Sequence, residues 1–367
     1  MKVLIASDKF KGSLTSQQVC TICHDVLVHR YPKASFDIQP MADGGDGTGA
    51  LIAASSDLEL ISIDGCDALF RLIRSHYYRD KTSAYIEMAA SCGLALLSPD
   101  ERNAYHTSSY GLGVAIRQAL DDPSIETLHL FLGGSATNDL GVGMATALGY
   151  QFSDRDGKEI FPIPSQLSAL HEINQGHIHP RIKEVQTHIY TDVTNPLLGP
   201  QGATYIYGPQ KGIPKDQVAH LEGTITHVHD VLSTHFSQDV SLARGAGAAG
   251  GMGAGCSYFL NAAMHSGIEW FLSRFDMAHR IAEADIVITG EGCLDQQSLD
   301  GKVVSGVLDL AMLHGTKVII VCGRNRLESP IEATILSLSD VADSTEDSIT
   351  NAQHYLKNVI ERIVLPE

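Results

Sequence analysis

The sequence predicts an α/β fold of two domains: a discontinuous Rossmann-like domain with an open parallel sheet, and a mixed α/β domain inserted between its halves. Three observations support this prediction. Short runs of Val, Ile and Leu alternate with helical patterns near both ends of the chain, which is typical of βα units. Strand-like segments without a helix between them lie in the middle. The chain has 367 residues, which is long for one domain.

The N-terminal segment starts the parallel sheet. Residues 3–6 form the first predicted strand, residues 16–30 a helix and residues 35–40 the second strand. A further helix is expected after the glycine-rich turn at 44–47. This order of elements is that of an open α/β domain.

The middle of the chain has a different pattern. Strand-like segments at 69–78 and 84–88 follow each other without a helix-length spacer, so we expect an antiparallel portion here. The elements that follow are helix 107–121, strand 127–132, helix 138–148, strand 185–191 and a long amphipathic helix at 214–235.

Clean βα alternation returns near the C-terminus. The predicted elements there are strand 285–289, helix 302–313, strand 317–322 and a final helix at 346–363. The discontinuous domain is therefore predicted to comprise residues 1–66 and 268–367, and the inserted domain residues 67–267.

Two cysteines have the C-x-x-C spacing of redox and zinc motifs. Cys20 and Cys23 fall inside the helix whose start is marked by a capping box of Thr15 and Gln18, and no second C-x-x-C completes a zinc site. We therefore expect two buried thiols. The seven cysteines form no disulfide framework, which fits a reducing compartment.

The charge of the chain excludes some partners. The formal net charge is -17 and no Lys/Arg-rich run occurs, so neither nucleic acid nor an anionic membrane is an expected partner. No apolar stretch approaches the roughly 20 residues of a membrane span, and the first residues lack the apolar core of a signal peptide. A cytoplasmic location is expected.

Polar loops follow five of the predicted strands, and such loops meet at one edge of a parallel sheet. The first loop, at 7–16, offers Lys9, Lys11 and Ser13 at the start of a helix, a combination that binds phosphate. A solvated loop is the plain alternative. The second, at 42–48, sets Asp43 among glycines, which suits Mg²⁺ or proton abstraction, although Asp-Gly-Gly is also an ordinary turn.

The third and fourth loops fit an acidic substrate and a base. Ser135, Thr137 and Asn138 in the third loop suit an oxyanion or carboxylate, while Thr137, Asn138 or Asp139 can cap the next helix, and the two roles are compatible. Asp192 follows the strand that ends at Tyr190. With Pro196 in the first turn of the next helix, Asp192 has no evident structural duty and is the best candidate for a general base.

The fifth loop, at 289–302, carries Glu291 and Asp295 and ends in Lys302 at a helix start. Its Gly-Lys end is like that of a P-loop, but Gln296 stands where the first glycine is required, so it is not a Walker A motif.

A G-x-G-x-x-G motif is formed by Gly245, Gly247 and Gly250, with Glu269 at a distance suited to a ribose contact. It raises the alternative of a nucleotide-dependent dehydrogenase. Only a short, weak strand at 240–243 precedes it.

Six segments together resemble bacterial glycerate kinase of the first class, in the right order along nearly the whole chain. The resemblance implies two α/β domains and ATP-dependent transfer to D-glycerate, with the 2-phosphate as the expected product. Asp46 stands where the family usually has Glu, and Leu140 where a glycine commonly follows Asn-Asp. The segments are Asp8–Ser16, Pro40–Thr48, Gly133–Asp139, Asp192–Leu197, Gly245–Gly251 and Gly290–Ser298.

Phosphoryl transfer needs cations for phosphates, carboxylates for Mg²⁺ and a group that accepts the hydroxyl proton. The hypothesis for ATP is that Lys9, Lys11, Ser13, Lys302 and the glycines at 245, 247 and 250 bind it, with Lys11 also catalytic. For the remaining roles, Asp43 and Glu291 hold Mg²⁺, Asp192 or Asp295 is the base, and Ser135, Thr137 and Asn138 bind D-glycerate.

Two alternatives remain at this point. One is a dehydrogenase of a small hydroxy acid, and the other is a non-catalytic protein that binds small carboxylates. The expected partners are small molecules, and a homo-oligomer is compatible with the sequence. The sequence alone leaves open the 3-phosphate as product and the loop that binds adenine.

Overall fold

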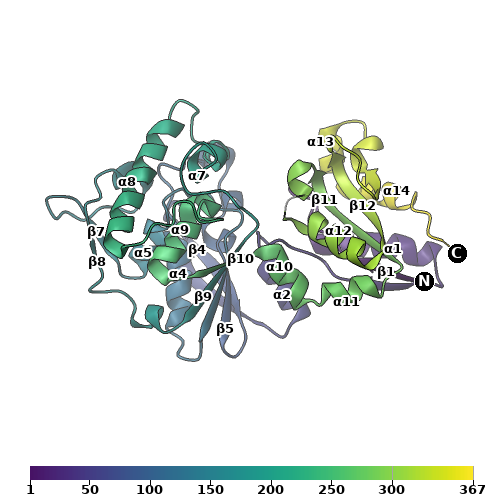
Figure 1. Cartoon of the computed structure of the whole chain (residues 1–367), viewed down its shortest axis with the longest axis horizontal. Coiled ribbons are helices and arrows are strands. Elements are labelled where there is room, and N and C mark those ends of the chain that lie inside the picture. The colour runs from purple at the N-terminus through teal and green to yellow at the C-terminus, as the bar shows by residue number, and fades with distance from the viewer. Residues whose placement is uncertain (300, 367) are drawn as a thin grey trace. The chain divides into compact units, whose positions relative to one another are not determined.

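The computed structural model of the chain describes residues 1–299 and 301–366. It separates into two compact units (Figure 1). The terminal unit combines residues 1–43 with residues 266–367, so the purple start and the yellow end of the chain lie in the same unit. The central unit consists of residues 44–265.

The terminal unit is built on a five-stranded sheet in the order β13-β12-β11-β1-β2. Every pair in it is parallel, and Val3 in β1 aligns with Ile286 of β11 on one side and Phe36 of β2 on the other. The strands are β1 (Lys2–Ile5), β2 (Ser35–Ile38), β11 (Ile286–Leu294), β12 (Lys317–Asn325) and β13 (Thr334–Ser337).

Helices cover both faces of this sheet. Val3 and Ile5 belong to a core shared with α1 and α14, whereas Leu4 is buried on the opposite side. Figure 1 shows α12 in front of the sheet and α1 behind it. The helices are α1 (Ser16–Arg30), α10 (Gly267–Arg274), α11 (Met277–Ala282), α12 (Val303–His314), α13 (Thr345–Thr350) and α14 (Ala352–Ile360).

The start of α1 confirms the predicted capping box. The Gln18 amide donates to Thr15 Oγ1 (3.2 Å), and the Thr15 amide donates to Gln18 Oε1 (2.9 Å). Two backbone donors are thereby satisfied at the helix start. Cys20 and Cys23 are both buried in this helix as free thiols, as expected.

An ion pair fixes the edge strand of the terminal unit. Arg280 in α11 donates to both carboxylate oxygens of Asp37 in β2 (2.9 and 2.5 Å) and to Gln39 Oε1 (2.6 Å). Hydrogen bonding to Arg280 lowers the pKa of Asp37. This pair obeys the usual rule that a carboxylate beside a guanidinium stays ionised.

The central unit contains a six-stranded sheet in the order β10-β9-β6-β5-β4-β3. β5, β6 and β9 are parallel to one another, while β3, β4 and β5 pair antiparallel. The strands are β3 (Glu59–Cys66), β4 (Leu72–Arg79), β5 (Ser83–Glu87), β6 (Thr127–Phe131), β9 (Gln186–Thr191) and β10 (Ala263–Ser266), and β7 (Gln151–Ser153) and β8 (Glu172–Asn174) form a separate hairpin.

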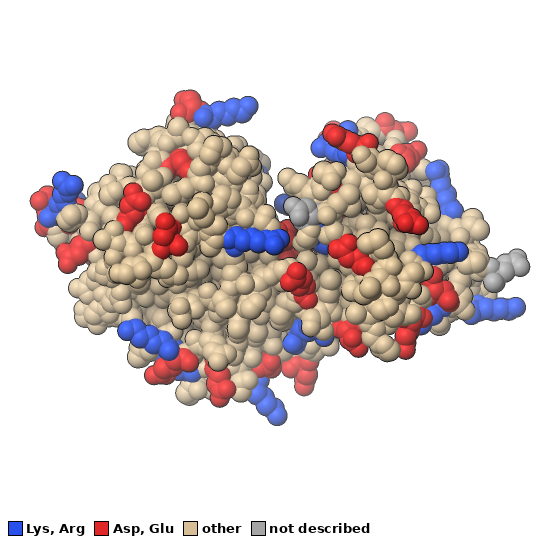
Figure 2. Space-filling view, viewed as in Figure 1, with Lys and Arg blue, Asp and Glu red and all other residues tan. Residues whose placement is uncertain are grey.

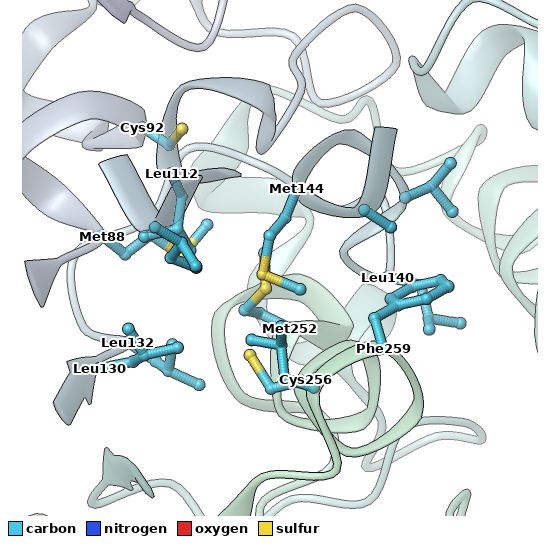
Figure 3. Packing of buried hydrophobic residues seen from close by; sticks show 14 of the residues in the cluster. Met88, Cys92, Leu112, Leu130, Leu132, Leu140, Met144, Met252, Cys256 and Phe259 are labelled. Atoms are coloured by element: carbon cyan, nitrogen blue, oxygen red, sulfur yellow. The ribbon is translucent and has the colours of Figure 1, made fainter. Parts of the chain in front are cut away.

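The core of the central unit is apolar and rich in Met and Leu. Figure 3 shows Met144 and Met252 together at its centre, with Leu112, Leu140 and Phe259 around them. These side chains come from helices and loops that pack on one face of the sheet. The helices of the unit are α2 (Thr48–Ser55), α3 (Ala89–Cys92), α4 (Tyr110–Leu120), α5 (Val142–Ala147), α6 (Pro164–Leu167), α7 (Ala203–Tyr207), α8 (Val218–Phe236) and α9 (Ala248–Leu260).

The α/β fold class is confirmed, and the structure differs from the prediction in several elements. Strand β3 was not predicted, because this edge strand buries only Ile63 and Cys66 and therefore lacks a strong apolar alternation. It pairs with β4 in the central unit, although residues 44–66 were assigned to the discontinuous domain. The predicted helix 346–363 is two helices, α13 and α14.

The surface carries both signs of charge. On the face that Figure 2 shows, acidic and basic side chains alternate over both units. None of the described helices is long and apolar enough to cross a membrane.

Candidate functional site

The carboxyl ends of β1 and β11 form a candidate site in the terminal unit. These strands are neighbours, yet the chain leaves β1 toward β2 and leaves β11 toward β12, on opposite sides. Such a switch point leaves a crevice outside the strand ends where ligands bind. The two ends are joined, because the Asp8 amide donates to Gly290 O (2.9 Å) and Ser7 Oγ donates to the same oxygen (3.1 Å).

Four carboxylates interact at this edge. Burial, and then the charge of Asp43, raises the pKa of Asp8 well above its usual range, with Glu291 adding to the effect. Burial raises the pKa of Glu291 to about 7, and Asp295 and Asp43 contribute to the rise. Within the described residues, Glu291 Oε1 is buried without a hydrogen-bond partner. A cation would relieve the repulsion and stabilise the ionised forms.

This acidic cluster fits Mg²⁺ only together with phosphate. Among the described residues, no set of three Asp, Glu, His or Cys side chains is arranged to hold a metal ion. Mg²⁺ commonly uses one or two carboxylates and completes its shell with substrate phosphates and water. The carboxylates of Asp43 and Glu291 suit that mode of binding.

Glu291 and its neighbours correct one prediction. Residues 290–294 were expected in a loop, but β11 continues to Leu294, because Gly290 to Leu294 pair with Val321 to Asn325 of β12. Glu291 is therefore held on a strand. Residue 300, in the predicted fifth loop, lies outside the described residues.

The lysines of the terminal unit occupy different surroundings. The charge of Lys9 lowers the pKa of Asp8, and that of Lys302 lowers the pKa of Glu291, so both ammonium groups act on the acidic cluster. Lys302 immediately precedes α12, and Lys11 is exposed. Ser13 Oγ donates to Phe10 O (3.0 Å) within the turn.

Asp295 has a structural duty. Its Oδ1 accepts the amides of Gln297 (2.9 Å) and Ser298 (3.2 Å), and its own amide donates to Ser298 Oγ (2.9 Å). These bonds hold the turn that follows β11. Asp295, one of the two predicted bases, thus stabilises its own loop.

The second group of predicted site residues lies in the central unit, after β6 and β9. These strands are adjacent and parallel, with Phe131 opposite Tyr190, so the third and fourth loops leave the sheet at the same edge. The glycine-rich segment packs onto both loops: a Cβ on Gly250 would lie 2.0 Å from Thr137 O, and one on Gly247 would lie 2.2 Å from Pro196 O. The three segments are therefore in direct contact.

These contacts change the interpretation of the glycine motif. Residues 240–246 form no strand, so the strand that a Rossmann dinucleotide site requires before its first glycine is missing. Gly245, Gly247 and Gly250 allow close approach of the protein's own backbone, as Gly245 does toward Val193 O. Their role in ATP binding stays a prediction.

The third loop carries buried polar atoms that lack hydrogen bonds within the described residues. Ser135, Thr137 and Asn138 are all buried, and neither Thr137 Oγ1 nor Asn138 Oδ1 has a hydrogen-bond partner among the described residues. Asn138 Nδ2 donates to Thr204 Oγ1 (3.2 Å). Because buried polar atoms are rarely left unpaired, these atoms indicate a ligand.

Of the three candidate helix caps, Asp139 takes this role. Asp139 accepts the amides of Gly141 (3.3 Å) and Gly143 (3.2 Å) at the start of α5. It also accepts the Ser109 amide (2.8 Å) and hydroxyl (2.7 Å). Since Asp139 satisfies these donors, Thr137 Oγ1 and Asn138 Oδ1 are not needed as caps and can bind a ligand.

Asp192 directly follows β9 and is half-buried. After burial, its charge is the second cause that raises the pKa of Tyr207 to about 12. The helix predicted at Pro196 is absent, because α7 begins only at Ala203. Asn195 instead supports the loop: its Oδ1 accepts from Tyr207 Oη (2.7 Å), and its Nδ2 donates to Gln201 O (2.8 Å).

Sequence reasoning missed Lys211. Its side chain is buried, and its Nζ donates to Ser135 Oγ (2.9 Å) and to Thr137 O (2.6 Å). Burial lowers its pKa to about 7. Pro209 to Gly212 looks like an ordinary turn in the sequence, so no signal distinguished this lysine from a solvated one.

Comparisons with known proteins show the family of the chain. The sequence pattern of the glycerate kinase family matches residues 3–365. The glycerate 2-kinase of Escherichia coli (strain K12) is 38% identical over 327 residues, which are 88% of this chain and 85% of that protein. The glycerate kinase of Bacillus subtilis (strain 168) is 34% identical over 371 residues, covering 99% of this chain and 97% of that protein.

A solved structure agrees over the same length. The crystal structure of a candidate glycerate kinase 2 from Salmonella typhimurium LT2 is 32% identical, covers 98% of this chain and 97% of its own, and superposes with a TM-score of 0.77. Family pattern, sequence relatives and fold thus coincide along nearly the whole chain. The chain therefore belongs to the glycerate kinase family, whose members are transferases that phosphorylate an alcohol group.

Proposed function

We propose that this protein transfers the γ-phosphoryl group of ATP to D-glycerate, with the 2-phosphate as the product. The observation that carries the proposal is the family match over residues 3–365, a range that includes both groups of site residues described above. The free thiols of all seven cysteines favour the reducing cytoplasm as its location.

The terminal unit supplies the groups for ATP. Lys9, Lys11 and Lys302 neutralise phosphate charge, and Ser13 lies in the same loop as the first two. The carboxylates of Asp43 and Glu291 hold Mg²⁺. When bound, this ion withdraws charge from the phosphates and so stabilises the transferred group.

The central unit supplies the groups for glycerate. The hydroxyls of Ser135 and Thr137 and the amide of Asn138 bind the carboxylate and hydroxyls of the substrate. Asp192 accepts the proton of the attacking hydroxyl, whose oxygen then forms a bond to the γ-phosphorus while the bond to ADP breaks. Asp295 is the alternative base, and its Oδ1 accepts hydrogen bonds from the Gln297 and Ser298 amides.

The test is incubation with Mg-ATP and D-glycerate, with ADP release as the readout. Phosphorus NMR of the products then separates 2-phosphoglycerate from 3-phosphoglycerate. ADP release that depends on D-glycerate supports the proposal. Binding of D-glycerate without ADP release would indicate a carboxylate-binding protein, and a reaction that required NAD(P) and ignored ATP would indicate a dehydrogenase.

A further inference from the structure

Lys211 is a buried cation in the central unit. It ends the short turn of Pro209 to Lys211, and only 2% of its surface is exposed. Lysine is almost never fully buried unless it is paired with an opposite charge. Within the described residues, Lys211 forms no ion pair, and both of its hydrogen-bond acceptors are neutral oxygens.

No charged group around Lys211 forms an ion pair with it among the described residues. Asp139 is the charge that acts on it, and it raises the pKa of Lys211 against the larger effect of burial. The Asp139 carboxylate is occupied by Ser109, Gly141 and Gly143. Arg102, whose carbonyl lies against Gly212, is a further cation on this side. The free protein therefore holds the Lys211 amine without a partnered anion among the described residues, and burial disfavours its charged form.

The hydrogen bonds of Lys211 orient the third loop. Because Ser135 Oγ accepts the lysine proton, its own O–H is directed elsewhere and can donate to a ligand. Thr137 is held through its carbonyl, while its Oγ1 is left without a partner among the described residues. An ammonium, a hydroxyl donor and unpaired polar atoms together match a small anion that also carries hydroxyls.

We propose that Lys211 is a specificity-determining residue of the acceptor site: its ammonium fixes Ser135 and Thr137 and supplies the positive charge that selects a carboxylate over a neutral group. This inference rests on the proposed function, since it concerns the site assigned to glycerate. It explains why a chain of net charge -17 can take an acidic substrate.

The experiment compares two acceptors in two variants. D-glycerate carries the carboxylate, and its neutral amide, D-glyceramide, carries the same hydroxyls. Both are measured as substrates, or the amide as a competitive inhibitor, with wild type, Lys211→Met and Lys158→Met. Lys158 is an exposed lysine of the same unit and serves as the matched control.

We expect Lys211→Met to lower kcat/KM for D-glycerate by roughly 100-fold and to change the constant for the amide by less than about threefold. The KM for ATP should be unchanged, and Lys158→Met should behave as wild type. If Lys211→Met does not fold, Lys211→Gln replaces it, because glutamine keeps one N–H donor without the charge.

Equal losses on both acceptors would reduce Lys211 to a structural residue and overturn the inference. Normal kinetics with D-glycerate would overturn it as well. An active wild type in either case leaves the proposed function intact. A wild type that phosphorylates no glycerate at all removes the proposed function, and this assignment with it.

Discussion

Burial shifts the pKa values of the two groups of site residues in opposite directions. In the terminal unit, loss of hydration raises the pKa of the Glu291 carboxyl to about 7, and it also raises that of Asp8. In the central unit, loss of hydration lowers the pKa of the Lys211 ammonium to about 7. Burial therefore disfavours the charged form in each group of residues. The first is suited to a cation with its phosphates and the second to an anion.

The largest expected effect tests which unit supplies the base. Asp192→Asn should lower kcat by about 100-fold or more with a modest change in KM, because the amide cannot accept the hydroxyl proton. Steady-state kinetics with D-glycerate measure this. Asp156→Asn, at an exposed aspartate of the same unit, is the control. Near-normal turnover in Asp192→Asn, with a large loss in Asp295→Asn, would move the base to the terminal unit.

A second substitution tests the need for a cation at the acidic cluster. Glu291→Gln removes one carboxylate, so we expect about tenfold more Mg²⁺ for half-maximal activity, while the KM for D-glycerate stays the same. Mg²⁺ titrations of the ADP-release assay measure the shift. Glu328→Gln, an exposed glutamate of the same unit, should have no effect. An unaltered Mg²⁺ requirement in Glu291→Gln would count against Glu291 as a ligand.

A third prediction concerns the protons that Lys211 takes up when D-glycerate binds. With a pKa of about 7, Lys211 is mostly neutral at pH 8 in the free protein. A bound carboxylate favours the ammonium, so binding of D-glycerate at pH 8 should take up as much as about one proton, and little at pH 6. Calorimetry in buffers of different ionisation enthalpy measures the number. Uptake that persists in Lys211→Met would assign the proton to another group.

The smallest expected effect concerns Asp37, the carboxylate of the terminal unit that is paired with the Arg280 guanidinium. Arg280→Lys loses the two-pronged contact with Asp37, so unfolding should be easier by about 1 kcal/mol at pH 7, the pair being partly exposed. The pKa of Asp37 is lowered in the folded state, so its contribution exists above the unfolded pKa and disappears as the pH falls through the folded value. Urea unfolding at pH 7 and in acid should show a difference that shrinks in acid.

Local rules predicted much of the fold and the positions of the site loops. Strand-end loops converge wherever strands are parallel, so Asp8, Asp43 and Glu291 came together as the alternation of elements implied. The length of β11 was missed, because pairing with β12 overrides the turn-like Gly-Glu-Gly sequence. Lys211 was missed for another reason: its burial depends on a loop far away in the sequence, which no local pattern records.

Leu140, which departs from the family pattern, has an unusual backbone conformation. A glycine commonly stands at this position, and Leu140 adopts a left-handed backbone conformation, with φ of 52°. Its side chain is fully buried beside the methionines in Figure 3. Strain of about 1 to 3 kcal/mol for such a backbone is offset by the burial of a leucine side chain. The departure from glycine pointed to the backbone at this position. It could not show that burial of the leucine side chain would stabilise a left-handed conformation there.

The discontinuous terminal unit sets the order in which the protein can form during synthesis. β1 lies between β2 and β11, and the bond from the Lys2 amide to Asp285 spans 283 residues. At about 5 to 20 residues per second, β1 waits for tens of seconds before its neighbour leaves the ribosome. The central unit is complete by then. Nascent chains thus pass through a stage in which the central unit is complete while the sheet of the terminal unit still lacks β11, β12 and β13. At this stage the exposed edge of β1 is most in need of protection by chaperones.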